Sequence, residues 1–431
     1  MGGPLAALVL ACAAPGALAQ SAAPATYDPA FVQQMLKRLD AQDAEIKRLK
    51  SELARNGDAA GSAESAKAEA FPRLSFHGFG NIDFTARNAQ DNTGKRSVKD
   101  TFTLGQLDFF LTSRINESMS ILSEVVMEAG SDNKMGIDLE RLLFQWRFND
   151  YFNMDVGRYH TAVGYYNTAY HHGTWFQTAV GRPTMLDFED GGGIIPAHNV
   201  GVHFHGDIPS GSVGLGYILE VGNGRAYNEA DPGTVQNVGD VDKYKAVNLA
   251  FIARPEAIPG LQVGAGVYHD TLLPISNTTA AAGTPFLNAV GRTDELMFHA
   301  HAVYKHGPWE YLSEGYLVRH KSAGDVAHLT PAGFAQLAYK IDSLTPYTRF
   351  SYVHALNADR AWPFVGAAGL HYGPGVGLRW DFSTLAAFKV QYDLIHNSLA
   401  PDAAFYTLNG GTLTTVKGWD SMFTAQIAFT F

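Results

Sequence analysis

The sequence has a single cysteine, Cys12, among its 431 residues. No pair of cysteines is available to close a disulfide, so the fold must be held together by other interactions. Charge is also scarce, because Asp, Glu, Lys and Arg together make up 17% of the chain. Glycine-rich nucleotide-binding loops are absent, and we expect no nucleic-acid partner.

Long apolar runs are missing as well. After the N-terminal residues, no run reaches the roughly 18 residues that a membrane-spanning helix requires. A chain of this kind does not cross a membrane through helices, whereas a membrane protein made of strands is compatible with the sequence.

Catalytic motifs do not occur either. The sequence contains neither Gly-x-Ser-x-Gly nor His-Glu-x-x-His. A hydrolase built on strands would need a nucleophile, a base and an orienting partner on one exposed face, and no such set can be identified. We therefore expect no enzymatic activity and no cofactor.

The N-terminus has the features of an export signal. An apolar stretch of roughly a dozen residues precedes the small-x-small motif Ala-Leu-Ala at 17–19, which predicts a signal peptide over residues 1–19. No Lys or Arg precedes the apolar stretch, which is atypical. The alternative is a lipoprotein signal that ends at Cys12, with Leu10 where a small residue is usual.

Period-two alternation of apolar and polar residues begins at Leu74. In the segment FKVQYDL, for example, Phe388 and Val390 oppose Lys389 and Gln391. This pattern predicts sixteen strands at 74–87, 102–115, 119–129, 137–148, 151–160, 197–206, 212–221, 246–254, 260–271, 293–305, 309–320, 332–341, 346–355, 369–382, 386–397 and 419–431.

The connections between these strands alternate in length. Tight turns such as 149–150 and 306–308 alternate with long connections such as 161–196 and 398–418. Short turns at one end and longer loops at the other are typical of outer-membrane barrels. We therefore predict an all-β membrane protein, an antiparallel transmembrane β-barrel of about 16 strands over residues 74–431. A barrel of that size encloses an aqueous channel.

One segment before the barrel has a helical period. Apolar residues recur every seven positions within 28–54, at Val32, Leu39, Ile46 and Leu53. This predicts a short coiled-coil helix, which favours association of several copies over a lone amphipathic helix, because about three heptads are marginal in isolation. Residues 55–73 are small and polar and predict a flexible linker. An even strand number would place the coiled coil in the periplasm.

The last strand, WDSMFTAQIAFTF at 419–431, alternates strictly and ends on Phe431. It resembles the terminal strand of Gram-negative outer-membrane barrel proteins. That resemblance implies recognition by the barrel-assembly machinery and a location in the outer membrane, among its lipid and lipopolysaccharide.

The segment Tyr159–Pro183 has six aromatic residues and three histidines but no carboxylate. A connection that folds into a barrel packs against the wall, which suits aromatic and small residues better than a solvated loop would. We predict that 161–196 narrows the channel, and the alternatives are an outer lid or a subunit interface. The residues expected in the constriction are Tyr165, Tyr166, His171, His172 and Trp175.

Three further motifs are VGRYHTAVGYY at 156–166, AHNVGVHFHG at 197–206 and LGYILEVGNGR at 215–225. Together they resemble the phosphate-selective, polyphosphate-type porin family and its coiled-coil-bearing relatives over most of residues 74–431. The resemblance implies a homotrimer of sixteen-stranded barrels, each an anion-favouring channel. It also implies that Arg158 and Arg182 guide the anion.

Charge at the narrowest point decides the selectivity of a pore. Strand phase directs further arginines into the lumen, and for each of them a structural ion pair is the alternative to contact with a solute. The residues expected to act in permeation and selectivity are Arg158, Arg182, Arg141, Arg147, Arg349 and Arg379.

Two histidine pairs have i, i+2 spacing, His203 with His205 and His299 with His301. On a strand each pair points to one side and could chelate a metal ion or add pH-sensitive charge to the lumen. Because no cysteine and no carboxylate at ligand spacing accompanies them, we expect no metal site.

The sequence as a whole predicts an outer-membrane porin that allows passive diffusion of small hydrophilic solutes, anions among them, through a charge-lined channel. The alternative is a non-conducting structural or adhesion barrel, tethered through its coiled coil.

Overall fold

The computed structural model describes residues 72–90, 96–129, 134–170, 172–187, 193–226, 239–240, 242–273, 292–356, 358–359, 361–362, 369–399 and 416–431. The chain divides into two units, Met1–Ala70 and Phe71–Phe431. The predicted signal peptide at 1–19 and coiled coil at 28–54 lie outside the described residues. Among the described residues, no helix is long and apolar enough to span a membrane.

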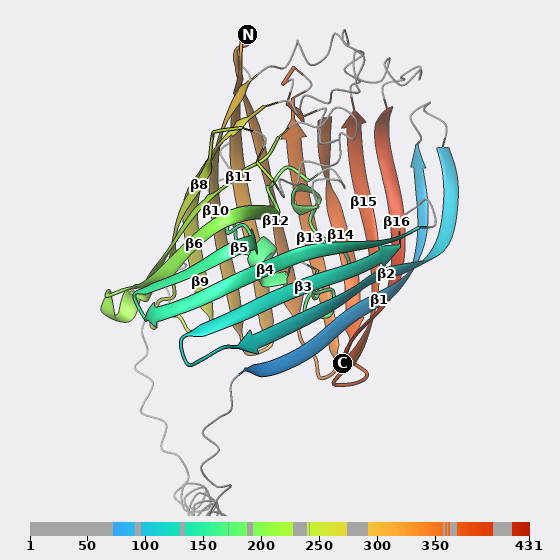
Figure 1. Cartoon of the computed structure of the whole chain (residues 1–431). Helices are drawn as coiled ribbons and strands as arrows, with labels where there is room; N and C mark the ends of the chain where they lie inside the picture. The colour runs from blue at the N-terminus through green and yellow to red at the C-terminus, as the bar shows by residue number, and fades with distance from the viewer. Residues whose placement is uncertain are drawn as a thin grey trace, which may run out of the picture. The chain divides into compact units, whose positions relative to one another are not determined.

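Sixteen strands within the described residues form one closed antiparallel barrel (Figure 1). Each strand pairs with its neighbours in sequence, and β1 pairs with β16 to close the cylinder. The strands are β1 (Arg73–Gln90), β2 (Arg96–Arg114), β3 (Met119–Ala129), β4 (Met135–Asn149), β5 (Phe152–His160), β6 (His198–Ile208), β7 (Leu215–Gly222), β8 (Ala246–Ala253), β9 (Leu261–Leu272), β10 (Thr293–His306), β11 (Trp309–Ser322), β12 (Ala327–Tyr339), β13 (Leu344–Ala355), β14 (Gly369–Trp380), β15 (Ala386–Leu399) and β16 (Val416–Thr430).

The predicted fold class and strand count are confirmed, because each predicted strand overlaps one observed strand. The bounds differ most at β2 and β12, which begin five or six residues before their predicted starts. Hydrogen bonding to a neighbouring strand can extend a strand beyond the residues in which apolar and polar side chains alternate regularly. Backbone pairing does not require an apolar face on the strand. β1 begins at Arg73, within the segment predicted as linker.

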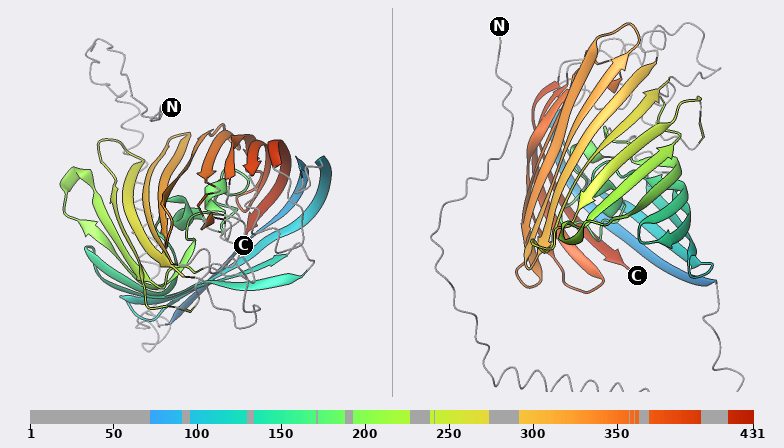
Figure 2. Two further views of the ribbon diagram at one scale, coloured as in Figure 1. Left: turned by 90° about the horizontal axis from the view of Figure 1, so that it is seen from above. Right: turned by 90° about the vertical axis from the view of Figure 1, so that its left-hand side faces the viewer.

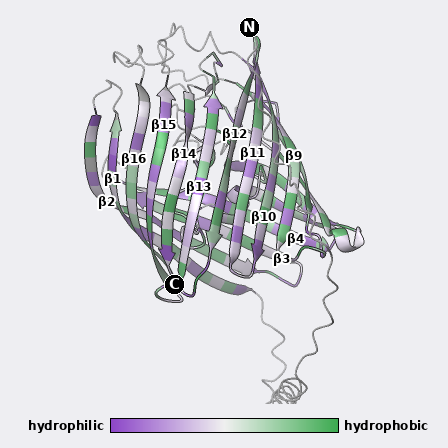
Figure 3. Cartoon of the chain, turned by 180° about the vertical axis from the view of Figure 1, so that it is seen from behind, coloured by the Kyte–Doolittle hydropathy of each residue, from purple (hydrophilic) through white to green (hydrophobic). Residues whose placement is uncertain are grey.

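Along the strands, apolar side chains that face the exterior of the barrel alternate with side chains, both polar and apolar, that face its interior. On β16, the outward Trp419, Phe423 and Ile427 are exposed, whereas the inward Thr424 and Gln426 are buried. Figure 3 shows hydrophobic and hydrophilic residues alternating along the strands. An exterior of this kind is stable against hydrocarbon, where all strand backbone groups must pair within a closed barrel.

Aromatic residues gather near the turn between β4 and β5. Phe148 stacks on Trp146 at 4.6 Å between ring centroids, and Phe152 lies 5.3 Å from Phe148. Phe204 of β6 continues the row at 5.7 Å from Phe152. Such a row is typical of the interfacial aromatic girdle of a membrane barrel. We call this end of the barrel, where the tight turns lie, the turn end.

One irregularity in the ladder bears on the site described below. Between β3 and β4, Glu124 pairs with Arg141 and the next pair is Val125 with Leu139. Glu140 is therefore the extra residue of a β-bulge, without a partner in β3. Bulges redirect side chains and are frequent beside functional sites.

The apolar exterior of the barrel predicts that a charged residue on an outward-facing strand position lowers stability. Val376 of β14 faces outward and is 54% exposed, and Val326, in the connection between β11 and β12, is 66% exposed. Val376→Arg is expected to lower the free energy of unfolding by about 2–4 kcal/mol, the cost of a cation on the lipid-facing side. Urea unfolding in lipid vesicles measures the loss.

Val326→Arg is the matched control, since it places the same side chain outside the strands, where surface substitutions cost less than about 0.5 kcal/mol. Equal effects of the two substitutions would contradict a lipid-facing exterior.

Candidate functional site

The connection between β5 and β6 lies inside the ring of strands, as the left view of Figure 2 shows. We call its described residues, 161–170, 172–187 and 193–197, the loop segment. It contains α2 (Tyr166–Tyr170) and the 3-10 turn η1 (Thr184–Leu186). A segment enclosed in this way has left the sheet, so its backbone groups need other partners.

The first part of the loop segment bonds to inward side chains of β7, β10 and β11. The Ala162 N–H donates to Glu220 Oε1 at 2.9 Å, and the Gly164 N–H donates to His299 Nδ1 at 3.1 Å. Glu314 Oε1 accepts the N–H groups that begin α2, that of Tyr166 at 2.6 Å and that of Tyr165 at 3.2 Å. The wall carboxylates thus satisfy N–H groups that have no partner within the helix.

Gly164 makes this approach possible. Its φ is +94°, and a Cβ on this residue would lie 2.1 Å from Glu314 Oε2. A glycine allows both the left-handed backbone and the close contact with the wall.

The later part of the loop segment bonds to strands further round the barrel, β13 and β14. Arg349 of β13 donates to the carbonyls of Gly181 and Val180, at 2.8 and 3.2 Å. Arg379 of β14 donates to the Trp175 carbonyl at 2.7 Å, with its guanidinium carbon 5.0 Å from the Trp175 ring centroid. Because β7 and β14 are seven strands apart in the ring of sixteen, the loop segment spans the lumen from Glu220 to Arg379.

Two further polar contacts come from β15. Lys389 Nζ donates to the Thr174 carbonyl at 2.5 Å, and Gln391 Oε1 accepts the Val180 N–H at 2.9 Å. Lys389 is fully buried. Its position against a carbonyl dipole shows that part of the inward charge of the barrel serves to hold the loop segment.

Apolar packing covers the rest of the contact. The loop segment contributes one set of buried side chains, and strands β10 to β13 contribute another through Met297, Leu312, Val318, Phe334 and Val353. Each fully buried side chain of this size stabilises the packing by about 1.5–3 kcal/mol. The inner wall therefore offers apolar side chains between its polar groups where the loop segment lies on it. The buried loop residues are Val163, Tyr166, Tyr170, Met185, Leu186, Ile194 and Ile195.

Tyr166 lies at the centre of this contact. Its ring is edge-on to that of Phe334 at 5.6 Å, and the Arg182 guanidinium carbon lies 5.7 Å from its centroid. Burial raises the pKa of the Tyr166 hydroxyl to about 12. The hydroxyl therefore stays protonated at neutral pH and faces the Gly181 carbonyl at 3.4 Å.

The predicted constriction residues Tyr165, Tyr166, His172 and Trp175 all belong to the loop segment. His171 lies outside the described residues. The six predicted arginines are not gathered at one point but occupy three places in the barrel.

Arg158 and Arg182 lie at the root of the loop segment. Arg158 is buried, donates from Nε to the Glu140 carbonyl at 3.1 Å, and has Nη2 within 4.0 Å of the Glu140 carboxylate. Arg182 donates to the Leu186 carbonyl and, at 3.0 Å, to Asn167 Oδ1. Both guanidinium groups therefore have partners inside the protein.

Arg349 and Arg379 occupy the second place, on β13 and β14, where they hold the loop segment as described. Arg141 and Arg147 lie on β4. Arg141 pairs with the buried carboxylate of Glu124. Arg147 is exposed and lines a cavity of about 600 Å³ at the turn end, together with His203, His205 and Arg254. The acidic residues of that lining are Glu117, Asp150 and Asp207.

Two more cavities lie beside the loop segment. One of about 430 Å³ is lined by Trp175, Lys305, Lys340 and Arg379, with Glu310 and Asp381 as its acidic residues. The other, of about 490 Å³, is lined by Tyr165, Arg254 and Lys305. Basic groups outnumber acidic ones in both linings.

Lys305 borders both of these cavities, and the sequence-based selection of permeation residues did not include it. Its ammonium group contacts the Tyr170 hydroxyl and lies 3.7 Å from Glu310 Oε2. The strand alternation does place Lys305 inside the barrel, because this residue continues the inward phase of His299 and His301 along β10. The strand pattern alone does not show that the loop segment lies next to it.

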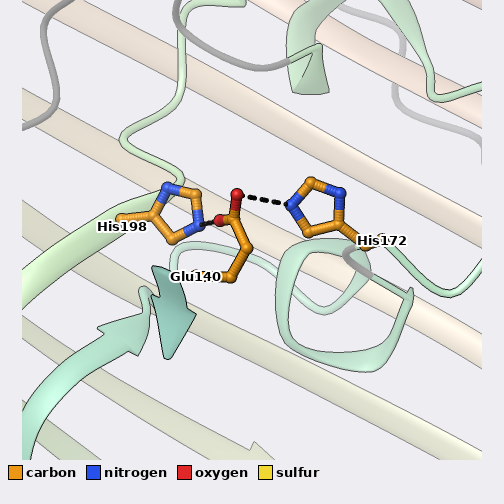
Figure 4. Close-up of side chains that lie close together, drawn as sticks. All are labelled: Glu140, His172 and His198. Carbon is orange, nitrogen blue, oxygen red and sulfur yellow. Dashed lines mark ion pairs between the residues drawn. The ribbon is translucent and has the colours of Figure 1, made fainter. Parts of the chain in front are cut away.

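The two histidine pairs have separate surroundings. His203 and His205 each lie 3.7 Å from Asp155 Oδ2. His299 accepts from the loop segment, and His301 Nε2 lies 3.2 Å from the amide of Gln262. Among the described residues, the group whose atoms are close enough to hold a metal ion is a different one, Glu140 with His172 and His198 (Figure 4).

The contacts of Arg349 predict a measurable loosening of the loop segment. Arg349→Met leaves the carbonyls of Val180 and Gly181 without their donor, a loss of about 1–3 kcal/mol. Amide hydrogen exchange over residues 174–182 should then become about 5- to 150-fold faster, since local opening costs less by that free energy.

Arg319→Met is the control, because Arg319 alternates with the buried Val318 and His320 and so points away from the loop segment. Unchanged exchange in Arg349→Met would show that Arg349 does not hold the loop segment.

No protein-family model matches the chain, and no curated protein sequence matches it. Solved structures do match its fold. An anion-selective porin from Comamonas acidovorans has a TM-score of 0.55 at 10% identity, over 83% of this chain and 99% of that one. The outer membrane channel DcaP of Acinetobacter baumannii has a TM-score of 0.54 at 12% identity, over 85% and 99%.

OmpT, an outer membrane protein of Vibrio cholerae, has a TM-score of 0.52 at 13% identity, over 86% of this chain and 100% of that one. At such identities the likeness establishes the fold, and the function has to be argued from the site.

Proposed function

We propose that this protein is an outer-membrane porin, which lets small hydrophilic solutes diffuse passively through a water-filled barrel narrowed by its third long connection. The observation that carries the proposal is the span of the loop segment across the lumen, from Glu220 on β7 to Arg379 on β14, seven strands away in the ring of sixteen. A sixteen-stranded barrel is too wide for its own side chains to fill. A segment fixed across it therefore determines the diameter of the channel at its narrowest point.

The arrangement of basic groups supports a preference for anions. Lys305, Lys340 and Arg379 line the cavity beside Trp175, and Arg254 and Lys305 line the next. A solute that passes the loop segment would meet these groups before bulk water. Phosphate selectivity, which the family resemblance implies, is one form of this preference.

Among the six arginines selected from the sequence, the geometry favours two as direct contacts for solutes. Arg147 and Arg379 line cavities. Arg379 also bonds to the loop segment and to Asp381, so it would act both by contact and by holding the segment. Arg141, Arg158, Arg182 and Arg349 line none of the three cavities and would act on selectivity through the position of the loop segment and through their field.

Assembly as a homotrimer belongs to the same proposal. A trimer form is described for OmpT of Vibrio cholerae, whose fold this chain shares with a TM-score of 0.51. The heptad pattern at 28–54 supports association of three copies through a periplasmic coiled coil. Assembly by the barrel-assembly machinery and contact with lipid and lipopolysaccharide follow from an outer-membrane location.

Single-channel recording in a planar bilayer tests the proposed function. A porin gives stepwise conductance increments that scale with salt concentration, because the ions move through water. Repeated silence from well-folded protein would contradict a pore and would favour the alternative, a structural or adhesion barrel sealed by the loop segment.

Charge reversal tests the anion preference. Lys305→Glu changes the charge beside the loop segment by two units, worth about 1 kcal/mol for an ion at roughly 8 Å. After screening by salt, the ratio of anion to cation permeability should fall about threefold, measured as a shift of the reversal potential in a salt gradient.

Lys321→Glu is the matched control, since Lys321 is exposed at the far end of the adjacent strand β11, on the outward phase. A reversal potential that shifts equally in both variants would exclude a local role for Lys305.

A further inference from the structure

Three buried side chains from separate elements meet at the root of the loop segment. Glu140 comes from β4, His172 from the loop segment and His198 from the first position of β6. They are 3%, 4% and 4% exposed, and one ligand atom from each lies within 4.8 Å of the others. The strand pairing explains part of this arrangement, because Glu140 is the bulged residue of β4.

The two imidazoles approach one carboxylate from opposite sides (Figure 4). His172 Nε2 lies 3.1 Å from Glu140 Oε1, and His198 Nε2 contacts Glu140 Oε2. Both rings therefore present the same nitrogen to the space around the carboxylate. A carboxylate between two such nitrogens supplies three donor atoms of the types that zinc takes in proteins.

We propose that Glu140, His172 and His198 form a binding site for a divalent transition-metal ion, with Zn²⁺ as the best-suited ion. Two imidazole nitrogens and one carboxylate oxygen suit Zn²⁺, Cu²⁺ and Ni²⁺ and disfavour Ca²⁺ and Mg²⁺, which prefer all-oxygen sites. Three protein ligands leave a fourth, tetrahedral position to water.

The geometry requires only a small contraction. Zinc binds nitrogen and oxygen at about 2.0–2.2 Å, so tetrahedral ligand atoms are roughly 3.4 Å apart. All three atoms lie within 4.8 Å of one another, and His172 Nε2 is 3.1 Å from Glu140 Oε1, so the longest separation must close by at most about 1.4 Å. His198 Nε2, which already contacts Glu140, must move slightly away from it. His172 belongs to the loop segment and is not fixed by a strand ladder, so it has the freedom to make that movement.

The surrounding charge is compatible with a cation. The carboxylates of Asp138 and Glu140 lie 3.9 and 4.0 Å from Arg158 Nη2. Glu124 pairs with Arg141 and lies 3.5 Å from His160, whose ring packs against that of His198 at 5.3 Å. Asp108 beside Glu124 and Arg182 near His160 add one group of each sign. Four carboxyl groups therefore face three guanidinium groups, so a divalent ion meets no excess of positive charge.

Such an ion would join the loop segment to β6, which follows the segment in the chain, and to β4, which pairs with β5, the strand before the segment. The site is independent of conduction, since it would bind metal in a sealed barrel as readily as in an open one. It was not expected from the sequence, because its ligands are spread over residues 140–198 and match no metal-binding motif.

The test uses the full chain without a histidine tag, folded in detergent and treated with a chelator, and titrates it with Zn²⁺ by calorimetry. We expect one equivalent of Zn²⁺ per chain. Co²⁺ in place of Zn²⁺ should give the intense visible absorption of a tetrahedral nitrogen and oxygen site. Absence of stoichiometric binding, or the weak absorption of octahedral Co²⁺, would overturn the proposal.

His172→Gln should weaken Zn²⁺ binding at least about 100-fold, because even the loss of an outer-shell partner weakens metal binding by about 10–100-fold. His198→Gln serves as the second ligand variant, and heat-modifiable migration on gels establishes that each variant is folded.

The double variant His203→Gln and His205→Gln is the matched control. It removes two histidines that also lie near a carboxylate, that of Asp155, elsewhere on β6. It should keep the full equivalent of Zn²⁺. Loss of Zn²⁺ from this variant, with retention in His172→Gln, would assign the ion to the other cluster and overturn the proposal.

Discussion

A peptide segment that leaves a sheet and enters the interior of a barrel must find hydrogen-bond partners there, and this constraint organises the inner wall. Glu220, Glu314 and His299 accept N–H groups of the loop segment, whereas Arg349 and Arg379 donate to its carbonyls. Each wall side chain thus supplies the hydrogen-bond acceptor or donor that its backbone partner needs. The polar residues of the lumen are therefore matched to one loop position before they are available to any solute.

The same constraint divides the interior into two kinds of surface. Along β10 to β13, apolar inward side chains such as Met297 and Phe334 pack on the loop segment, between polar ones such as Glu314 and Arg349 that bond to it. Toward the turn end the inward phase carries Lys305, Lys340 and Arg379 around open space. Arg379 belongs to both kinds of surface, since it lines this space and donates to the Trp175 carbonyl.

The strands could be predicted from the sequence because a closed barrel imposes two periodic requirements, an apolar exterior and alternating connection lengths. The loop segment could be predicted to pack, since its aromatic residues suit no solvated loop. Its partners could not be predicted, because contacts such as Val180 with Gln391 join residues 211 positions apart. Arg349 is the clearest case. The alternation shows that it faces inward, but it does not show that its guanidinium group donates hydrogen bonds to two backbone carbonyls. Glu140 is another, since the bulge that exposes it depends on the register of β3 against β4.

The central claim is that the loop segment, held by both walls, sets the bore of the channel. The most direct measurement compares the single-channel conductance of the native chain with that of a chain in which 165–187 is a glycine-serine segment of equal length. Without its aromatic packing the segment has nothing to hold it across the lumen, and the account predicts a clearly larger conductance. An unchanged conductance in a folded barrel would contradict it, because the narrowest point would then lie elsewhere.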